Sequence, residues 1–268
     1  MRSRVGHRPS RAAAAGATRS GIGARQALAR ITAAAALAVA GGLAMSACSG
    51  PPRAPSAHMA PHRGPAPISP GPALLATLRG AAPRYPSPDG SAAGRVPATW
   101  FGARSTLPVI GTRPGWVQVR LAQRPNGSTA WVRASDVTLS TTAYSIVIDL
   151  ATTHLTLYKD DLKVFSAPVG VGTRTDPTPT GQYFVAFFEA PPSPGYGAFI
   201  MVTSAHSQTI SNWDGSGDAV VGIHGPLGSD QEIGTAGARI SHGCIRMHEA
   251  DLLRLLVVPP GSPIDIIS

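Results

Sequence analysis

Apolar and polar residues alternate along much of the C-terminal half of the chain, and this pattern predicts β-strands. Such runs lie at 144–150, 155–158, 164–169, 182–188 and 198–202. The first three are separated by short turns and predict a β-meander. Residues 249–256 instead carry leucines at helical spacing, which predicts one amphipathic helix beginning at His248 or Glu249. Its predicted apolar side consists of Leu252, Leu253, Leu255 and Leu256.

A second, smaller β unit is predicted over residues 97–140. Its short apolar runs lie at 107–110, 116–121 and 130–132. Turns rich in Gly and Pro separate these runs, as is typical of antiparallel hairpins. The strand sequences GWVQV and WVRASDV resemble those that close the small barrel of bacterial SH3-like domains. That resemblance implies cell-wall binding. The alternative, which we favour, is a spacer whose core is filled by Trp116 and Trp131.

Proline and glycine dominate the stretch before this unit. Residues 49–96 contain eleven Pro and six Gly. Such a composition cannot bury enough apolar surface to offset the entropy lost when the chain is ordered. We therefore expect residues 48–96 to form a disordered, Pro-rich linker, in which residues 74–78 add at most one helical turn.

The N-terminal region has the composition of a secretory signal. An acid-free, Arg-rich segment is followed by an uncharged run from Ile31 to Ala47, which ends in small residues before Cys48. This order predicts a signal peptide over residues 1–47. Small residues before Cys48 also resemble a bacterial lipobox, which implies a lipid on Cys48 and an anchor in the cell membrane. A transmembrane anchor and plain secretion to the cell wall are the alternatives. Each of these predicts an extracytoplasmic protein.

The net charge of +9 is unevenly divided along the chain. Residues 1–48 hold seven Arg and no acid, and residues 49–142 hold ten Arg against two Asp, so both regions are strongly basic. Residues 143–268 hold six basic and twelve acidic residues. The excess of positive charge therefore lies outside the larger β region and coincides with no recognisable nucleic-acid-binding motif. We expect no nucleic-acid partner.

The densest group of reactive residue types lies at 240–246, with His224 upstream. A cysteine acyl-transfer enzyme needs a thiol that can lose its proton, an imidazole that accepts it, and N–H groups directed at the developing oxyanion. Cys244 and His224 meet the first two needs if the chain folds His224 back onto Cys244. A lone cysteine is more often a small buried hydrophobe. A zinc or redox site is a further alternative, but no complete ligand set is recognisable, so we expect no metal and no cofactor.

The sequence Ser-His-Gly-Cys-Ile-Arg at 241–246, with His224 seventeen positions before Ser241, resembles the signature of the YkuD-type L,D-transpeptidases of bacterial cell walls. Residues 169–172 and 178–181 also resemble that family. The likeness covers most of residues 143–268. It implies a mainly β catalytic domain, a YkuD-type β-sandwich or barrel with one or two short helices, over 143–268.

The resemblance also implies roles for the central residues. Cys244 is implied to be the nucleophile, and His224 the general base and acid. The backbone carbonyl of Gly225 is implied to orient the His224 ring. The N–H groups of His242, Gly243 and Cys244 are implied to form the oxyanion hole.

Two further positions of the motif are implied to support this centre. Ser241 is implied to be structural, and the ring of His242 to support the site. Arg246 is implied either to grip a substrate carboxylate or to serve as an ion-pair partner, and the sequence leaves both open. Trp213 and Tyr196 lie in loops and either line a substrate cleft or pack internally.

The reaction implied by the resemblance acts on peptidoglycan stem peptides. Cys244 forms a thioester with the third residue of a tetrapeptide stem, D-Ala leaves, and an amine of a neighbouring stem completes a 3-3 cross-link. Water as acceptor gives an L,D-carboxypeptidase, and a protein amine gives attachment of that protein. β-Lactams of the carbapenem type are implied as covalent inhibitors. A non-catalytic, wall-binding lipoprotein is the alternative from another class.

Overall fold

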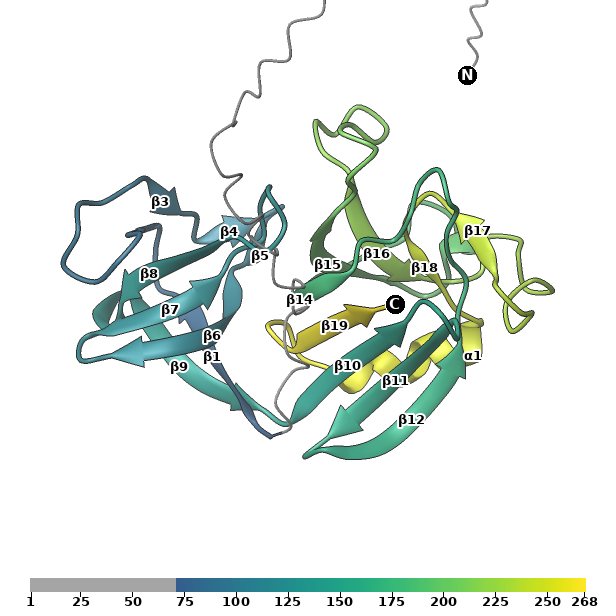
Figure 1. Cartoon of the computed structure of the whole chain (residues 1–268), viewed down its shortest axis with the longest axis horizontal. Coiled ribbons are helices and arrows are strands. Elements are labelled where there is room, and N and C mark those ends of the chain that lie inside the picture. Colours follow the sequence, from purple (N-terminus) through teal and green to yellow (C-terminus); the bar gives the residue numbers. More distant parts are fainter. Residues whose placement is uncertain (1–70) are drawn as a thin grey trace, which may run out of the picture. The chain divides into compact units, whose positions relative to one another are not determined.

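The computed structural model describes residues 71–268, which form a mainly β protein with a single short α-helix (Figure 1). The predicted signal peptide, Cys48 and the first part of the predicted linker lie outside the described residues. Within residues 71–268, no helix is long and apolar enough to cross a membrane.

A five-stranded antiparallel sheet forms the small β domain, a name we use for residues 73–142. The elements are β1 (Ala73–Leu78), β2 (Ala82–Pro83), β3 (Arg95–Val96), β4 (Thr99–Trp100), β5 (Ala103–Arg104), β6 (Thr106–Arg113), β7 (Trp116–Arg120), β8 (Thr129–Arg133), the 3-10 turn η1 (Ala134–Asp136) and β9 (Val137–Thr142). The strand order in the sheet is β8-β7-β6-β1-β9. Strands β2 and β3 form one separate pair, and β4 and β5 form another. Alternation along β7 buries Val117 and Val119, whose side chains contribute to the core.

The linker prediction is wrong for residues 73–96, because part of this stretch is built into the sheet. Strand β1 pairs with both β6 and β9, so it lies inside the sheet. Leu75, Ala76 and Leu78 are buried in the core. Pairing on both sides and burial decide the conformation of this apolar run, which local composition alone assigns to a helical turn.

An eight-stranded sheet forms the larger domain. Its strands are β10 (Tyr144–Asp149), β11 (His154–Lys159), β12 (Leu162–Pro168), β14 (Gly181–Glu189), β15 (Ile200–His206), β16 (Val220–His224), β18 (Ile245–Arg246) and β19 (Pro263–Ile267). The order is β12-β11-β10-β19-β14-β15-β16-β18. Strand β19 runs parallel to β10 and antiparallel to β14. The strands predicted from the alternating pattern are all present, and β16, β18 and β19 are additional.

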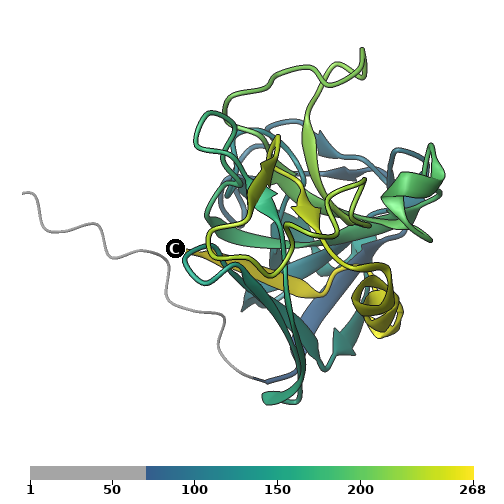
Figure 2. The same cartoon turned by 90° about the vertical axis from the view of Figure 1, so that its right-hand side faces the viewer.

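Short elements complete this domain. Strands β13 (Val171–Gly172) and β17 (Arg239–Ser241) pair in parallel, and η2 (Pro194–Tyr196) is a 3-10 turn. The predicted helix begins at Glu249 as expected, but only α1 (Glu249–Leu252) is α-helical, and η3 (Leu253–Val257) continues as a 3-10 helix. Figure 2 shows this coil beside the sheet.

The apolar side of the helix is narrower than the sequence predicts. Leu252 and Leu255 are buried, whereas Leu253 and Leu256 are exposed. The change to the tighter 3-10 turn alters the angular spacing of the side chains, which accounts for part of this difference.

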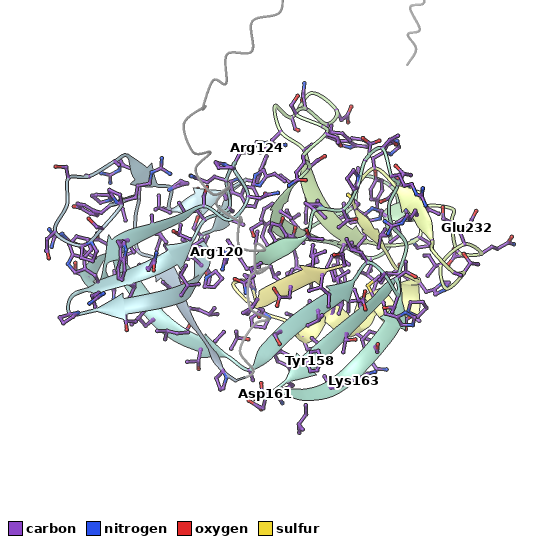
Figure 3. All side chains as sticks on the ribbon, in the orientation of Figure 1. Arg120, Arg124, Tyr158, Asp161, Lys163 and Glu232 are labelled. Carbon is purple, nitrogen blue, oxygen red and sulfur yellow. The ribbon has the colours of Figure 1, made fainter. Side chains whose placement is uncertain are left out.

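The two sheets share a hydrophobic cluster. Val119 and Val132 of the small β domain belong to the same cluster as Phe184, Phe187 and Val202 of β14 and β15. A polar contact accompanies this packing, since Arg120 Nη2 of β7 donates to Gln182 Oε1 of β14 at 2.7 Å (Figure 3). The small β domain therefore packs directly against the sheet that carries the reactive residues.

Candidate active site

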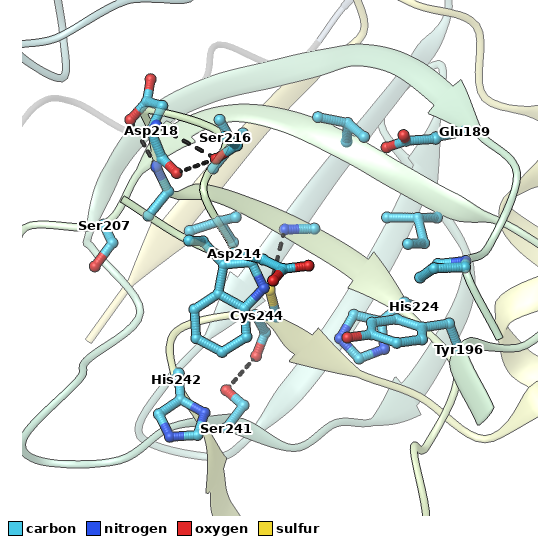
Figure 4. A pocket seen from close by; sticks show the side chains of 18 of the residues that line it. Glu189, Tyr196, Ser207, Asp214, Ser216, Asp218, His224, Ser241, His242 and Cys244 are labelled. Carbon is cyan, nitrogen blue, oxygen red and sulfur yellow. Dashed lines mark hydrogen bonds between the residues drawn. The ribbon is translucent and has the colours of Figure 1, made fainter. Parts of the chain in front are cut away.

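Two parallel strands place His224 and Cys244 on one face of the sheet. Strands β16 and β18 pair with His224 opposite Arg246. Cys244 directly precedes β18 and lies two positions before Arg246, level with Gly222. Alternate residues of a strand face the same side, so Cys244, His224 and Arg246 share a face. The Gly222 N–H donates to Cys244 Sγ at 3.5 Å. Both reactive residues line one pocket with a volume of about 420 Å³ (Figure 4).

The imidazole of His224 is buried and held by its neighbour. Its Nδ1 lies 2.8 Å from the carbonyl oxygen of Gly225. A carbonyl can only accept, so Nδ1 carries the hydrogen and Nε2 is left with its lone pair. Burial lowers the pKa of His224 to about 4, the positive charge of Arg246 acts in the same direction, and the bond to Gly225 opposes them. The ring is therefore neutral near pH 7 and can accept a proton at Nε2.

The thiol of Cys244 is also held in its neutral form. Burial raises the pKa of Cys244, and this effect outweighs the bond from the Gly222 N–H and the charge of Arg246, which lower it. The resting pair is thus a thiol and a neutral imidazole. Such a pair reacts by transferring the thiol proton to the imidazole as sulfur attacks.

A turn stabilised by two hydroxyl groups presents Cys244. Ser241 Oγ accepts the Gly243 N–H at 3.1 Å and donates to the carbonyl of Cys244 at 2.6 Å. Thr178 Oγ1 donates to the carbonyl of Gly243 at 2.8 Å and accepts the Gly172 N–H at 2.9 Å. Gly243 has φ of 116°, a conformation that only glycine adopts readily. The Gly243 N–H thus has a partner inside the turn, whereas the sequence prediction assigned it to an oxyanion.

Close backbone packing requires glycine at position 225, whose carbonyl also holds the His224 ring. A Cβ at this position would lie 2.7 Å from the backbone nitrogen of Gly197. The Gly225 N–H donates to the carbonyl of Tyr196 at 2.7 Å. This contact sets the Tyr196 ring against the His224 ring, with centroids 4.7 Å apart.

Arg246 has donors left over. Its Nη1 donates to Ser229 Oγ at 2.9 Å, while its Nε is buried without a hydrogen-bond partner among the described residues. No carboxylate of residues 71–268 forms an ion pair with it. The sequence left two roles open for Arg246. Residues 71–268 contain no acidic partner for the ion-pair role.

The aromatic and histidine residues considered from the sequence have different surroundings. Trp213 and Tyr196 both line the pocket. The Trp213 ring lies 5.4 Å from the exposed His242 ring. His206 is buried beside Asp218, with Nε2 3.1 Å from Oδ2. His154 is exposed. Within residues 71–268 no group of three or more His, Cys, Asp or Glu side chains is arranged to hold a metal ion.

Sequence reasoning missed several residues that build the pocket. Phe101 comes from the small β domain, while Phe187, Val202 and Val220 come from the larger sheet. Thr178 is missed as the hydroxyl that supports Gly243, although the motif at 178–181 was noted. These contacts join segments far apart in the sequence, and no local pattern signals them.

Comparisons with known proteins cover this same region. A family model described as the YkuD L,D-transpeptidase catalytic domain matches residues 143–266. The YkuD protein of Bacillus licheniformis, named as an L,D-transpeptidase, is 32% identical over 127 residues, which cover 47% of this chain and 67% of that protein. The Bacillus subtilis protein of the same name is 29% identical over 127 residues, with the same shares covered. A solved L,D-transpeptidase from Mycobacterium smegmatis is 18% identical, covers 57% of this chain and 91% of that one, and has a TM-score of 0.37.

Proposed function

Because the chain belongs to the YkuD family of L,D-transpeptidases, we propose that it acts on peptidoglycan with Cys244 as nucleophile and His224 as general base and acid. The observation that carries this proposal is the shared face of β16 and β18, on which both side chains line one pocket. The free lone pair of His224 Nε2 supports the role of a proton acceptor.

The first half of the proposed reaction forms a thioester. The Cys244 thiol gives its proton to His224 Nε2 as sulfur attacks the carbonyl of the third residue of a tetrapeptide stem. The bond to D-Ala breaks, and His224 returns the proton to the departing amine. N–H groups of His242 and Cys244 are proposed to bind the oxyanion, because the Gly243 N–H is already bonded to Ser241.

The second half returns the enzyme to its starting state. An amine of a neighbouring stem attacks the thioester, His224 takes a proton from that amine, and the new amide closes a 3-3 cross-link. The bond between carbonyl carbon and sulfur breaks, and Cys244 regains a proton. Water or a protein amine in place of the stem amine would give carboxypeptidation or protein attachment by the same site.

Arg246 is proposed to bind a carboxylate of the stem peptide. Arg246 lines the pocket, and no carboxylate of residues 71–268 forms an ion pair with it. A carboxylate accepting from this guanidinium would form a charge-assisted hydrogen bond.

We further propose that residues 1–47 are a signal peptide and that Cys48 carries a lipid, so the enzyme works outside the cytoplasm.

Purified full chain carrying Cys48→Ser tests the function when incubated with disaccharide-tetrapeptide muropeptides and analysed by mass spectrometry. We expect loss of D-Ala with dimer formation, and neither with Cys244→Ala. Loss of D-Ala without dimers would identify a carboxypeptidase. Intact Cys244 with no turnover and no thioester would contradict the enzymatic proposal and favour the wall-binding alternative. A carbapenem should add its mass to the chain once, and not to Cys244→Ala.

A further inference from the structure

One loop of the larger domain forms a wall of the pocket, and we call residues 207–219 the pocket loop. It connects β15 to β16 and contributes Trp213, Asp214 and Ser216 to the pocket lining. Trp213 packs against His242, two residues before Cys244. The position of this loop therefore affects how open the space in front of the thiol is.

The pocket loop closes on itself at Asp218. The Trp213 N–H donates to the backbone carbonyl of Asp218 at 2.7 Å, and Ser216 Oγ donates to the same oxygen at 2.6 Å. Hydrogen bonds thus connect the part of the loop that carries Trp213 to Asp218. A contact that fixes the position of Asp218 therefore also restricts the position of Trp213.

A single arginine of the small β domain contacts the pocket loop both near its start and near its end. Arg124 Nε contacts Asp218 Oδ1 at 2.9 Å, Nη1 donates to the carbonyl of Ser207 at 2.5 Å, and Nη2 donates to the carbonyl of Ile210 at 2.9 Å (Figure 3). A half-exposed ion pair alone contributes little to stability. Three acceptors arranged around one planar guanidinium, however, fix a geometry that a lysine ammonium reproduces only in part.

A second contact from the same segment braces the start of the loop. Asn126 Nδ2 donates to the carbonyl of His206 at 2.8 Å, and Asn126 Oδ1 accepts the His206 N–H at 2.9 Å. The His206 ring in turn contacts the carboxylate of Asp218. Residues 124–126 therefore hold the start of the pocket loop at 206–210 and its end at Asp218.

The small β domain also reaches the pocket directly. Phe101 lines the pocket, is 61% exposed, and has φ of 47°, which is unusual for a bulky residue. Its ring lies 6.1 Å from that of Phe187. Residues in such backbone conformations persist only where their surroundings hold them, and they cluster at ligand sites.

We propose that the small β domain is part of the active site and that Arg124 is a positioning residue, which holds the pocket loop so that Trp213 packs against His242 beside the approach to Cys244. This deepens the proposed function, since the wall that Arg124 sets is the wall of the substrate pocket. It assigns the small β domain a role other than that of a spacer.

The test compares full-chain Arg124→Gln with Arg113→Gln, which removes the same charge from an exposed position at the end of β6. The first readout is the rate at which N-ethylmaleimide labels Cys244, followed by peptide mapping so that Cys48 is scored separately. We expect Arg124→Gln to label about tenfold faster and to raise the KM for tetrapeptide by a similar factor. Arg113→Gln should match the wild type, and Arg124→Lys should fall between.

A double mutant separates positioning from general loosening of the fold. If Arg124 acts through Trp213, the effect of Arg124→Gln on labelling should fall below about twofold in a Trp213→Ala background. Equal labelling in Arg124→Gln and Arg113→Gln, or an effect that persists without Trp213, would overturn the proposal. If Arg124→Gln does not fold, the same comparison of Cys244 labelling is made with Arg124→Lys, in the wild-type chain and in the Trp213→Ala chain. Wild-type chain that labels as expected but never turns over muropeptide would refute the proposed function and leave this inference standing.

Discussion

The chemistry of the centre depends on how burial acts on two side chains. His224 is neutral at physiological pH because its surroundings desolvate the imidazolium, and Cys244 keeps its proton for the same reason. A resting thiolate–imidazolium pair is therefore not favoured. In the proposed reaction the proton therefore moves to His224 as sulfur attacks the acyl carbon.

This protonation state predicts the pH dependence of alkylation. A raised pKa means that the thiolate fraction of Cys244 is below that of a free cysteine at every pH below the raised value. The rate of iodoacetamide labelling at Cys244 should keep rising through pH 9 without a plateau between pH 5 and 7. Peptide-resolved mass spectrometry of the Cys48→Ser chain measures it, with free cysteine as a comparison. A plateau in the acidic range would instead indicate a preformed ion pair.

The sequence identifies some site residues far better than others. Cys244, His224 and Ser241 were predicted because their motif resembles that of the YkuD family, and the structure places all three in the lining of one pocket. Arg124 and Thr178 cannot, because each acts on atoms distant in the chain, and hydroxyl or guanidinium contacts to backbone leave no sequence pattern.

Between elements, the hydroxyl of Thr178 connects the segment before β14 to the turn that presents Cys244. Thr178 is buried, and it serves both the Gly172 N–H and the Gly243 carbonyl. Its removal leaves a buried donor and a buried acceptor unpaired.

Thr178→Val is accordingly expected to lower the free energy of unfolding by about 1–3 kcal/mol and to reduce acylation of Cys244. Urea denaturation and the rate of carbapenem adduct formation measure the two effects. Thr178→Ser, which keeps the hydroxyl, should retain most of both. Thr180→Val makes the same change at an exposed neighbour and should be close to wild type; equal losses at both positions would contradict the bridging role.

Prediction of elements succeeds where the pattern is local. Strands β10, β11 and β14 alternate clearly and were predicted. Strand β1 was not, because its alanines and leucines carry no strand signal, and only its two partners in the sheet make it a strand. Short strands such as β18 cannot be predicted from the sequence either, because two residues are too few to show an alternating pattern.

At the scale of the whole molecule, the shared cluster makes the two sheets interdependent. Val119, in the small β domain, and Phe184, in the larger sheet, belong to one buried group. Unfolding either sheet would expose apolar surface of the other, which favours a single cooperative transition.

Calorimetry of the full chain should therefore show one transition for the described residues, with calorimetric and van 't Hoff enthalpies in agreement. Val119→Ala should lower the stability of that transition by about 2 kcal/mol and speed maleimide labelling of the distant Cys244 under mild denaturation. Val164→Ala, at a half-exposed site, should change stability by less than about 0.5 kcal/mol. Two separate transitions, with Cys244 insensitive to Val119→Ala, would show that the sheets are independent.

The position of β19 has a consequence for the order of events during synthesis. Strand β19 joins two groups of strands in the sheet, β10 to β12 on one side and β14, β15, β16 and β18 on the other, and it follows Cys244 in the chain. A chain made from its N-terminus exposes Cys244 before the strand that unites the two halves exists. For that interval the thiol has no finished pocket around it, and its protection from oxidants depends on how soon residues 263–267 follow.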